Sequence, residues 1–229
     1  MTLATARIQE ERAFWCGALG LERTPGAPDG GFAVAVGDGV LAFRPAPESA
    51  APPAHHVALE VAPERLVDAA EWLAAAAPLV ELDGPEGPEA IVDFPAWAAH
   101  SVYAVTPGGH VLELIARHRR PWTPPAGDGG ALVRGLSEVG VCAPDVVSLV
   151  DRLHGLGLEP WFGDPASGFA AVGDESGLLI CVREWRHWFP TARPAVPGSV
   201  SVVLEAVPAL HPEDPVVVGS ATELRALPT

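Results

Sequence analysis

Internal repetition is the feature that most constrains the fold of this chain. Three short blocks recur in the same order, at offsets of 137, 137 and 136 residues: Leu19-Gly20-Leu21-Glu22, Gly31-Phe32-Ala33 and Val36-Gly37-Asp38 return as Leu156-Gly157-Leu158-Glu159, Gly168-Phe169-Ala170 and Val172-Gly173-Asp174. A second correspondence links His56-Val57-Ala58-Leu59 with Glu138-Val139-Gly140-Val141. Blocks that keep their order and spacing indicate repeated structural units. We therefore expect three related modules, at residues 2–45, 54–118 and 134–206.

Each module predicts one strand, one helix and a run of further strands. In the second module an alternating apolar run, Val57 to Val61, leads through an Ala-Pro turn into a helix. Four apolar residues then recur at steps of three and four, which gives the helix one apolar face: Leu66, Ala69, Ala70 and Leu73. A strand from Ser101 to Val105, a glycine turn and a strand from Val111 to Ile115 close the module. The pattern predicts an α+β fold of tandem βαβββ modules.

The domain organisation follows from the gaps between modules. We expect residues 1–118 to hold modules one and two as a pair, with the first module shortened. Residues 119–133, which are rich in proline and glycine, are predicted to be a linker. Residues 134–229 would hold module three and a C-terminal extension. An unpaired module leaves an open sheet edge, so we expect it to pair with the C-terminal residues or, in the leading hypothesis, with a second chain as a homodimer.

Composition excludes several classes of protein. The formal charge is −15 and the 14 basic residues are all arginines, so binding to a phosphate backbone is not expected. No apolar run reaches the roughly 18–20 residues that cross a bilayer, and charged residues interrupt the N-terminal segment where a signal peptide needs an apolar stretch. We expect a cytoplasmic protein without a membrane or nucleic-acid partner. Three dispersed cysteines, Cys16, Cys142 and Cys181, indicate neither a disulfide framework nor a zinc ribbon.

The strands at the two ends of module two carry a family resemblance. The opening segment is His55-His56-Val57-Ala58-Leu59-Glu60-Val61, and the closing segment runs from Ser101 through Thr106-Pro107-Gly108-Gly109 to Leu112-Glu113-Leu114. Together they resemble the vicinal oxygen chelate superfamily, which includes glyoxalases, bleomycin- and fosfomycin-resistance proteins and extradiol dioxygenases. The resemblance extends over the three modules. It implies curved mixed sheets whose concave face holds a divalent metal.

The resemblance places metal ligands at His56 and Glu113. Imidazole and carboxylate donors suit Fe, Mn, Zn or Ni, and an open coordination position suits a substrate with two neighbouring oxygens. Strand parity agrees, because His56, Ala58 and Glu60 share one face. From the residues alone, Glu113 either faces solvent or makes a buried polar bond.

Other polar residues of module two are weaker candidates. The resemblance makes His100 and Tyr103 candidates for substrate contact and proton transfer, although Tyr103 could equally be a core residue. His55 could lie at the rim of the site, and His110 is expected to have a local role in its turn. The aromatic run Trp185-Arg186-His187-Trp188-Phe189 is expected to fill a core or an interface rather than form a lid over a ligand. Glu10 and Glu11 are expected at the surface.

The ligand set departs from the pattern of the family. Module one offers only Thr5, Gln9, Glu10 or Glu11 near the position of a ligand. Module three has Glu138 where module two has His56, but its closing strand is apolar, so a second complete metal site is not expected. Two functions therefore remain open. One is a metal-dependent dioxygenase- or glyoxalase-like enzyme with an unidentified third ligand, and the other is a metal-free protein that sequesters a small molecule.

Overall fold

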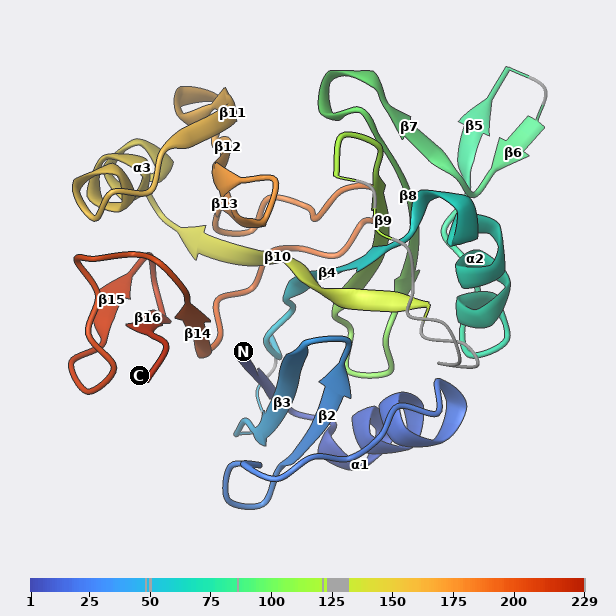
Figure 1. Cartoon of the computed structure of the whole chain (residues 1–229), viewed down its shortest axis with the longest axis horizontal. Helices are drawn as coiled ribbons and strands as arrows, with labels where there is room; N and C mark the ends of the chain where they lie inside the picture. The colour runs from blue at the N-terminus through green and yellow to red at the C-terminus, as the bar shows by residue number, and fades with distance from the viewer. Residues whose placement is uncertain (48, 50, 86, 121, 123–131, 229) are drawn as a thin grey trace.

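Eight strands form the larger sheet of the computed structural model, which describes residues 1–47, 49, 51–85, 87–120, 122 and 132–228. Figure 1 shows these strands, whose spatial order is β11-β12-β13-β10-β4-β9-β8-β7. The sheet is mixed, since β4 runs parallel to β9 and antiparallel to β10. Its strands are β4 (His56–Val61), β7 (Val92–Phe94), β8 (Ala99–Val105), β9 (Val111–Arg117), β10 (Val133–Ala143), β11 (Pro160–Asp164), β12 (Phe169–Asp174) and β13 (Gly177–Arg183).

Module two forms one half of this sheet and matches the predicted pattern. The helix α2 (Leu66–Ala74), preceded by the 3-10 turn η2 (Pro63–Arg65), buries the four predicted apolar residues and packs on β8 and β9. A small hairpin of β5 (Leu82–Gly84) and β6 (Gly87–Glu89) and the 3-10 turn η3 (Pro95–Trp97) flank β7. The alternating apolar residues of β4 therefore face a helix, as the sequence predicts.

Module three forms the other half in the same way. Its helix α3 (Val146–Gly155) starts at Asp145, whose side chain accepts a hydrogen bond from the backbone of Val147 at 3.0 Å. The turn η4 (Pro165–Ser167) joins β11 to β12. The glycine of the repeated Leu-Gly-Leu-Glu block has the same backbone role in both modules. Gly20 and Gly157 each lie just after a helix and have positive φ, at 69° and 87°. Glycine adopts this left-handed conformation without a steric penalty.

The smaller sheet joins module one to the C-terminal residues, in the order β15-β16-β14-β1-β3-β2. Module one supplies β1 (Thr2–Thr5), the helix α1 (Ile8–Arg12) with the π-helical turn η1 (Ala13–Ala18), β2 (Phe32–Val36) and β3 (Gly39–Pro45). The C-terminal strands are β14 (Val200–Leu204), β15 (Val216–Val218) and β16 (Thr222–Ala226). Residues 200–226 repeat the strand plan of module one without its helix, because β14 pairs parallel with β16 and β16 pairs antiparallel with β15, as β1 pairs with β3 and β3 with β2. The two units join where β14 pairs antiparallel with β1.

The pairing of modules corrects the expectation from sequence. Modules two and three share one sheet through β4 and β10, whereas module one pairs with the C-terminal strands. The edge of β10 that motivated a homodimer is thus occupied within the chain. The repeat could not reveal this arrangement, because strands of equivalent modules have similar edges. The linker expected at 119–133 falls mostly outside the described residues.

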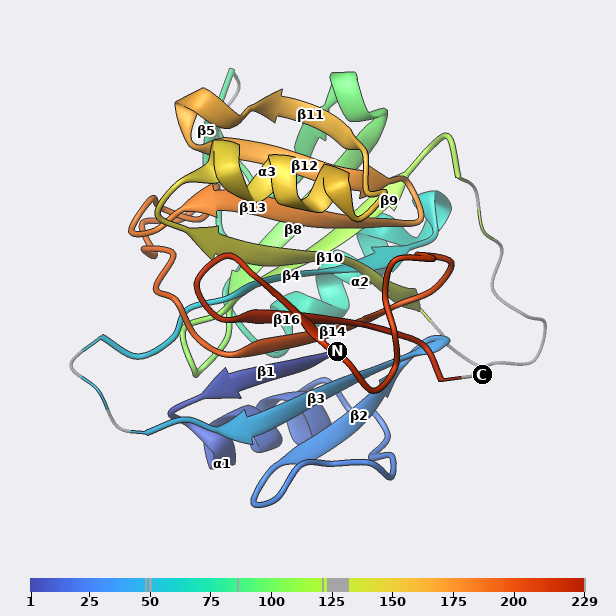
Figure 2. The ribbon, with the colours of Figure 1, turned by 90° about the vertical axis from the view of Figure 1, so that its left-hand side faces the viewer.

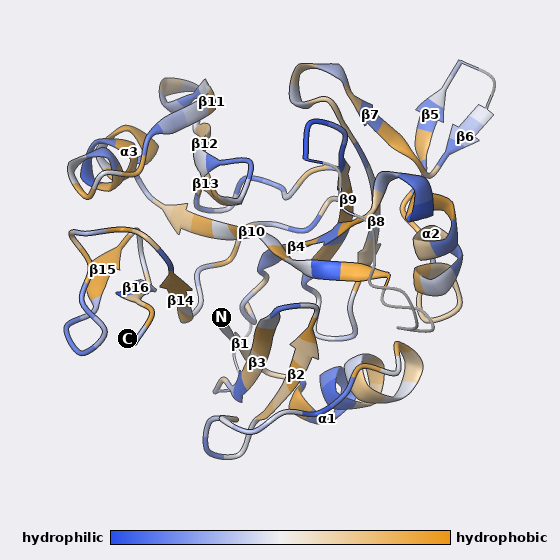
Figure 3. Ribbon diagram, in the orientation of Figure 1, coloured by the Kyte–Doolittle hydropathy of each residue, from blue (hydrophilic) through white to orange (hydrophobic). Residues whose placement is uncertain are grey.

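One hydrophobic core joins the two sheets and their helices. Figure 2 shows the smaller sheet lying beside the larger one, and Figure 3 shows hydrophobic residues following the strands of both. The same buried cluster contains Leu3 and Phe43 of the smaller sheet and Val57, Leu59 and Val139 of the larger one. Among the described residues, no helix is both long and apolar enough to cross a membrane.

A buried carboxylate fastens module one to module two. Glu11 on α1 is fully buried, and its side chain accepts hydrogen bonds from Trp15 Nε1 at 2.7 Å, Thr106 Oγ1 at 2.5 Å and the backbone of Gly108 at 2.5 Å. The expectation that Glu11 lies at the surface was therefore wrong. Burial raises the pKa of Glu11 although these three bonds favour its charged form.

We expect Glu11→Ala to lower the free energy of unfolding by about 2–5 kcal/mol, because it leaves buried donors without an acceptor. Urea denaturation would measure this change. Glu10→Ala is the matched control, since Glu10 is exposed beside Arg7, and its effect should stay within about 0.5 kcal/mol. Equal stability of the two variants would contradict the role of Glu11.

Two stacked histidines lie where the two sheets meet. The rings of His55 and His110 are 5.1 Å apart, and both are buried. The backbone N–H of His55 donates to His110 Nδ1 at 3.2 Å, and His55 Nε2 lies 3.1 Å from the carbonyl oxygen of Ala4 on β1. Burial lowers the pKa of His55 to about 4 and that of His110 well below its usual value, where His55 adds charge repulsion. His110 thus links strands, beyond the local turn role expected.

This pair predicts a loss of stability on acidification. The unfolded chain binds a proton at His110 below about pH 6.5 while the folded chain does not, so the unfolded state gains relative stability as the pH falls. We expect the wild type to lose more stability than His110→Asn, which keeps a side-chain acceptor, and the difference in slope should approach about 1.4 kcal/mol per pH unit near pH 5. Denaturation series from pH 7 down to pH 5 would measure this slope, and identical slopes would refute it.

Candidate metal centre

Three neighbouring strands place His56, Glu113 and Glu138 on the concave face of the larger sheet. Strand β4 lies between β9 and β10, and Ala58 is the register partner of both Glu113 and Glu138. His56 and Ala58 point to the same side of β4 because side chains alternate along a strand. The three side chains therefore point to the concave side of the curled sheet, opposite to the face that packs on α2 and α3, and this concave side is called the hollow below.

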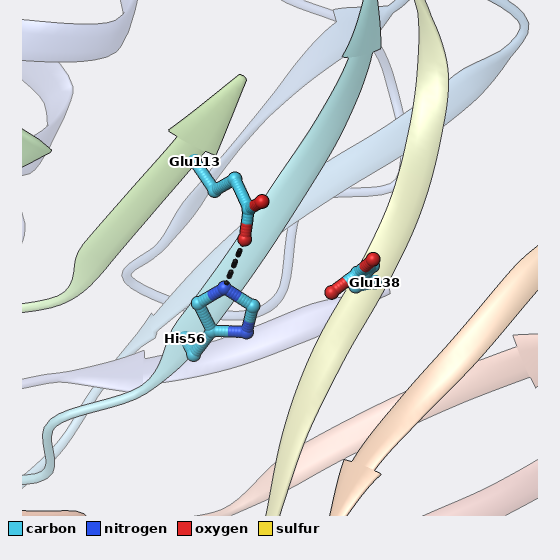
Figure 4. A group of neighbouring side chains, drawn as sticks. All are labelled: His56, Glu113 and Glu138. Atoms are coloured by element: carbon cyan, nitrogen blue, oxygen red, sulfur yellow. Dashed lines mark hydrogen bonds and ion pairs between the residues drawn. The ribbon is translucent and has the colours of Figure 1, made fainter. Parts of the chain in front are cut away.

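The donor atoms of these residues are close enough to share one ion. Imidazole and carboxylate atoms of the three residues all lie within 4.8 Å of one another, and every side chain is buried. His56 Nε2 is 2.8 Å from Glu113 Oε2. Figure 4 marks this contact with a dashed line and shows the carboxylate of Glu138 nearby. Such a set of one nitrogen and two oxygen donors suits a divalent ion of the first transition row. The residues present thus fit a metal.

Tyr103 fixes the second oxygen of Glu113. Its hydroxyl donates a 2.8 Å hydrogen bond to Glu113 Oε1, and the two residues are register partners on β8 and β9. Burial and the charge of Glu113 raise the pKa of Tyr103 well above its usual value, so that it remains a donor. The hydrogen bond from Tyr103 leaves Oε2 of Glu113 directed at His56.

The pKa values of the three residues reflect their mutual contacts. Burial alone would lower the pKa of His56, but the hydrogen bond and charge of Glu113 raise it. Burial opposes ionisation of Glu113, yet the contacts with His56 lower its pKa. Burial and the charge of Glu113 raise the pKa of Glu138 to about 7 in spite of the neighbouring Arg117. The contact with His56 thus favours the charged form of Glu113, and the charge of Glu113 opposes ionisation of Glu138.

Arg117 is the cation that faces Glu138. It extends from β9 on the concave side, is 1% exposed, and forms an ion pair with Glu138 and hydrogen bonds with Ser137 Oγ at 3.3 and 3.4 Å. The rings of Trp97 and Trp161 each lie 5.8 Å from the guanidinium carbon. These tryptophans come from η3 and β11, at opposite ends of the sheet, yet their rings are 4.8 Å apart. The sheet is thus curled until its two ends meet.

The segment after β13 covers the histidine side of the hollow. Trp188 stacks on His56 with ring centroids 5.7 Å apart, and its Nε1 donates to the carbonyl oxygen of Ala54 at 2.8 Å. Gly140 makes room for the indole, since a Cβ there would lie 2.4 Å from it. The ring of Phe189 lies 6.0 Å from that of Tyr103. Part of the aromatic run expected to fill a core therefore does so at the site itself.

The structure does not bring every candidate residue to this site. His100 lies on the opposite face of β8 from Tyr103, where its ring bonds His118 at 2.7 Å and approaches Asp93 at 3.5 Å. Glu138 and Arg117 belong to this cluster, although the sequence did not identify either as a residue of the site. The sequence repeat aligns Glu138 with His56, which marks Glu138 as a possible ligand. Only the pairing of β4 with β10 brings Glu138 to the same site as His56. Nothing in the sequence distinguished Arg117 from the basic residues that follow it.

Comparison with known proteins places the fold. Neither a family model nor a curated protein sequence matches this chain. Among solved structures, a putative dioxygenase from Bacillus subtilis subsp. subtilis str. 168 matches with a TM-score of 0.57 and 15% identity, over 90% of this chain and 68% of its own. A glyoxalase I mutant from Zea mays matches with a TM-score of 0.52 and 13% identity, over 89% and 73% of the two chains.

These likenesses confirm the resemblance at the level of architecture. Both matches cover most of the present chain, so they include both sheets and are not limited to one module. At such low identity the comparison establishes the fold and does not assign a substrate or an ion. This chain shares its α+β fold of curled mixed sheets with these dioxygenase and glyoxalase I structures, as the resemblance to the vicinal oxygen chelate superfamily predicts.

Proposed function

We propose that this protein is a divalent-metal-dependent enzyme, dioxygenase- or glyoxalase-like, that acts on a small molecule with vicinal oxygens. The observation that supports this function is the convergence of His56, Glu113 and Glu138, whose donor atoms lie within 4.8 Å of one another. Each comes from a different strand, and each is buried, which is costly for carboxylates unless a cation compensates them. The ion would be Fe, Mn, Zn or Ni, as the donor set allows.

The protein part of the mechanism is positioning in a hollow shielded from water. A bound divalent ion supplies Lewis-acid polarisation of a substrate oxygen. Tyr103 holds Glu113 by the hydrogen bond to Oε1, and Arg117 holds Glu138 by an ion pair. Module three places apolar Ile180 beside Gly140, where the equivalent pair in module two is Glu113 beside Ala58. Module three therefore adds no fourth donor at this position, where the indole of Trp188 packs against Gly140.

Of the two residues considered for catalysis, Tyr103 lies at the proposed centre and His100 does not. Tyr103 touches Glu113 and is available as a hydroxyl donor at the centre. His100 points away from the hollow, toward His118, so we do not assign it a role in the reaction. General acid–base chemistry needs a group within hydrogen-bond reach of the reacting atoms. Of the two, Tyr103 is the residue that lies beside a proposed metal ligand.

A second candidate function is metal-free binding of a small molecule in the same hollow. It is favoured by two contacts within the protein, of His56 with Glu113 and of Arg117 with Glu138, because they give each carboxylate a partner that is not a metal ion. Aromatic side chains around the hollow, among them Trp97 and Trp161, would contact an apolar ligand. The two functions differ in whether the wild-type protein retains a transition metal.

Metal analysis of the purified protein tests the proposed centre. We expect one transition-metal ion per chain after loading with each of the four ions in turn and dialysis, because three convergent donors bind it. His56→Ala, Glu113→Gln and Glu138→Gln should each weaken binding at least about tenfold.

His100→Ala is the matched control, since it removes an imidazole from the same module outside the hollow, and it should keep the wild-type metal content. Wild-type protein that retains none of the four ions would refute the enzyme and favour the metal-free function. Retention of the ion by Glu138→Gln would exclude Glu138 as the third ligand.

A further inference from the structure

Arg117 carries a charge whose partner is also a proposed metal ligand. Its Nη2 pairs with Glu138, and its Nε and Nη2 approach the neutral hydroxyl of Ser137. Its Nη1 is buried and has no hydrogen-bond partner among the residues that the structure describes. A buried guanidinium nitrogen without a partner is costly, so this atom is available to an acceptor from outside the chain.

Metal binding would increase the need of Arg117 for a further hydrogen-bond acceptor. Once Glu138 shares its carboxylate with a divalent ion, it compensates Arg117 less well. The next acidic residue on β4, Glu60, is already paired with Arg120 at 2.8 Å and lies 3.6 Å from Arg134. A divalent ion and one guanidinium set against the carboxylates of Glu113 and Glu138 leave a single positive charge in a buried hollow. An anion of one charge complements it.

The side chains around Arg117 add a restriction on shape. Two indole rings, of Trp97 and Trp161, flank the guanidinium at 5.8 Å, and Phe94 packs on Trp97 at 6.1 Å. The two indole rings contact each other edge to face, so they line one side of the guanidinium and do not enclose a slot. Aromatic side chains favour an aromatic or conjugated ligand, and the guanidinium fork matches the two oxygens of a carboxylate. The restrictions on charge and on shape apply beside the metal centre, because Arg117 contacts the proposed metal ligand Glu138.

We propose that Arg117 binds the carboxylate of the substrate, so that the site selects planar, singly charged aromatic or conjugated carboxylic acids with an oxygen next to the carboxylate. This inference rests on the proposed metal centre and names the substrate class for it. Arg117 is then a specificity-determining residue, and Trp97 and Trp161 are the walls of its subsite.

Binding of two matched probes to the zinc-loaded protein tests the inference. Salicylate is planar and carries a carboxylate beside a hydroxyl, and salicylamide is its uncharged counterpart. Titration calorimetry and the quenching of tryptophan fluorescence would measure both affinities. We expect salicylate to bind the wild type about ten- to a hundredfold more tightly, the range of a charge-assisted hydrogen bond in a buried site. Arg117→Gln should remove this preference when both affinities are measured on its zinc-loaded fraction.

Arg120→Gln is the matched control, because it removes the same charge from the partly exposed partner of Glu60 and should change the preference less than about twofold. Equal affinity of the wild type for the two probes, or no binding of either, would overturn the inference whether or not Arg117→Gln folds. An undiminished preference for salicylate in the zinc-loaded fraction of Arg117→Gln would also overturn it, since Arg117 would then only position Glu138. Wild-type protein that retains none of the four ions would refute the metal centre itself, and the inference with it.

Discussion

The antiparallel pairing of β4 with β10 is the interaction on which the site depends. It joins two modules edge to edge, and its register sets Ala58 opposite Glu138 while Ala58 also faces Glu113 on β9. A shift of one residue would turn Glu138 toward the helices, because side chains alternate along a strand. The apolar residues of both strands, Val57 and Val139 among them, lie in the core on the other face and hold this register.

Charge compensation in the hollow explains why so many ionisable groups can be buried there. Each carboxylate has a partner of its own: His56 and Tyr103 contact Glu113, and Arg117 contacts Glu138. Buried charges persist in folded proteins when they are paired and hydrogen-bonded. The same contacts set the geometry of the donors, so the network that makes burial tolerable also prepares the proposed centre for an ion.

The smaller sheet supports the larger one without contributing to the hollow. Glu11 of module one accepts hydrogen bonds from the turn between β8 and β9, the two strands that carry Tyr103 and Glu113. His55, next to His56, reaches the backbone of β1. Module one therefore has none of the ligands that a paired module would provide, and its polar residues stabilise the strands that do.

The sequence by itself determined the module plan and two residues of the site. Periodicity gave the helix of module two with its four buried residues, and the family resemblance placed His56 and Glu113 together, because both lie in one module whose strands are close in sequence. Only the tertiary structure decided which modules pair, and with that pairing came Glu138, Arg117 and the exclusion of His100. Repeated modules present similar edges, so local patterns cannot rank their pairings. The choice is made by burial summed over both sheets.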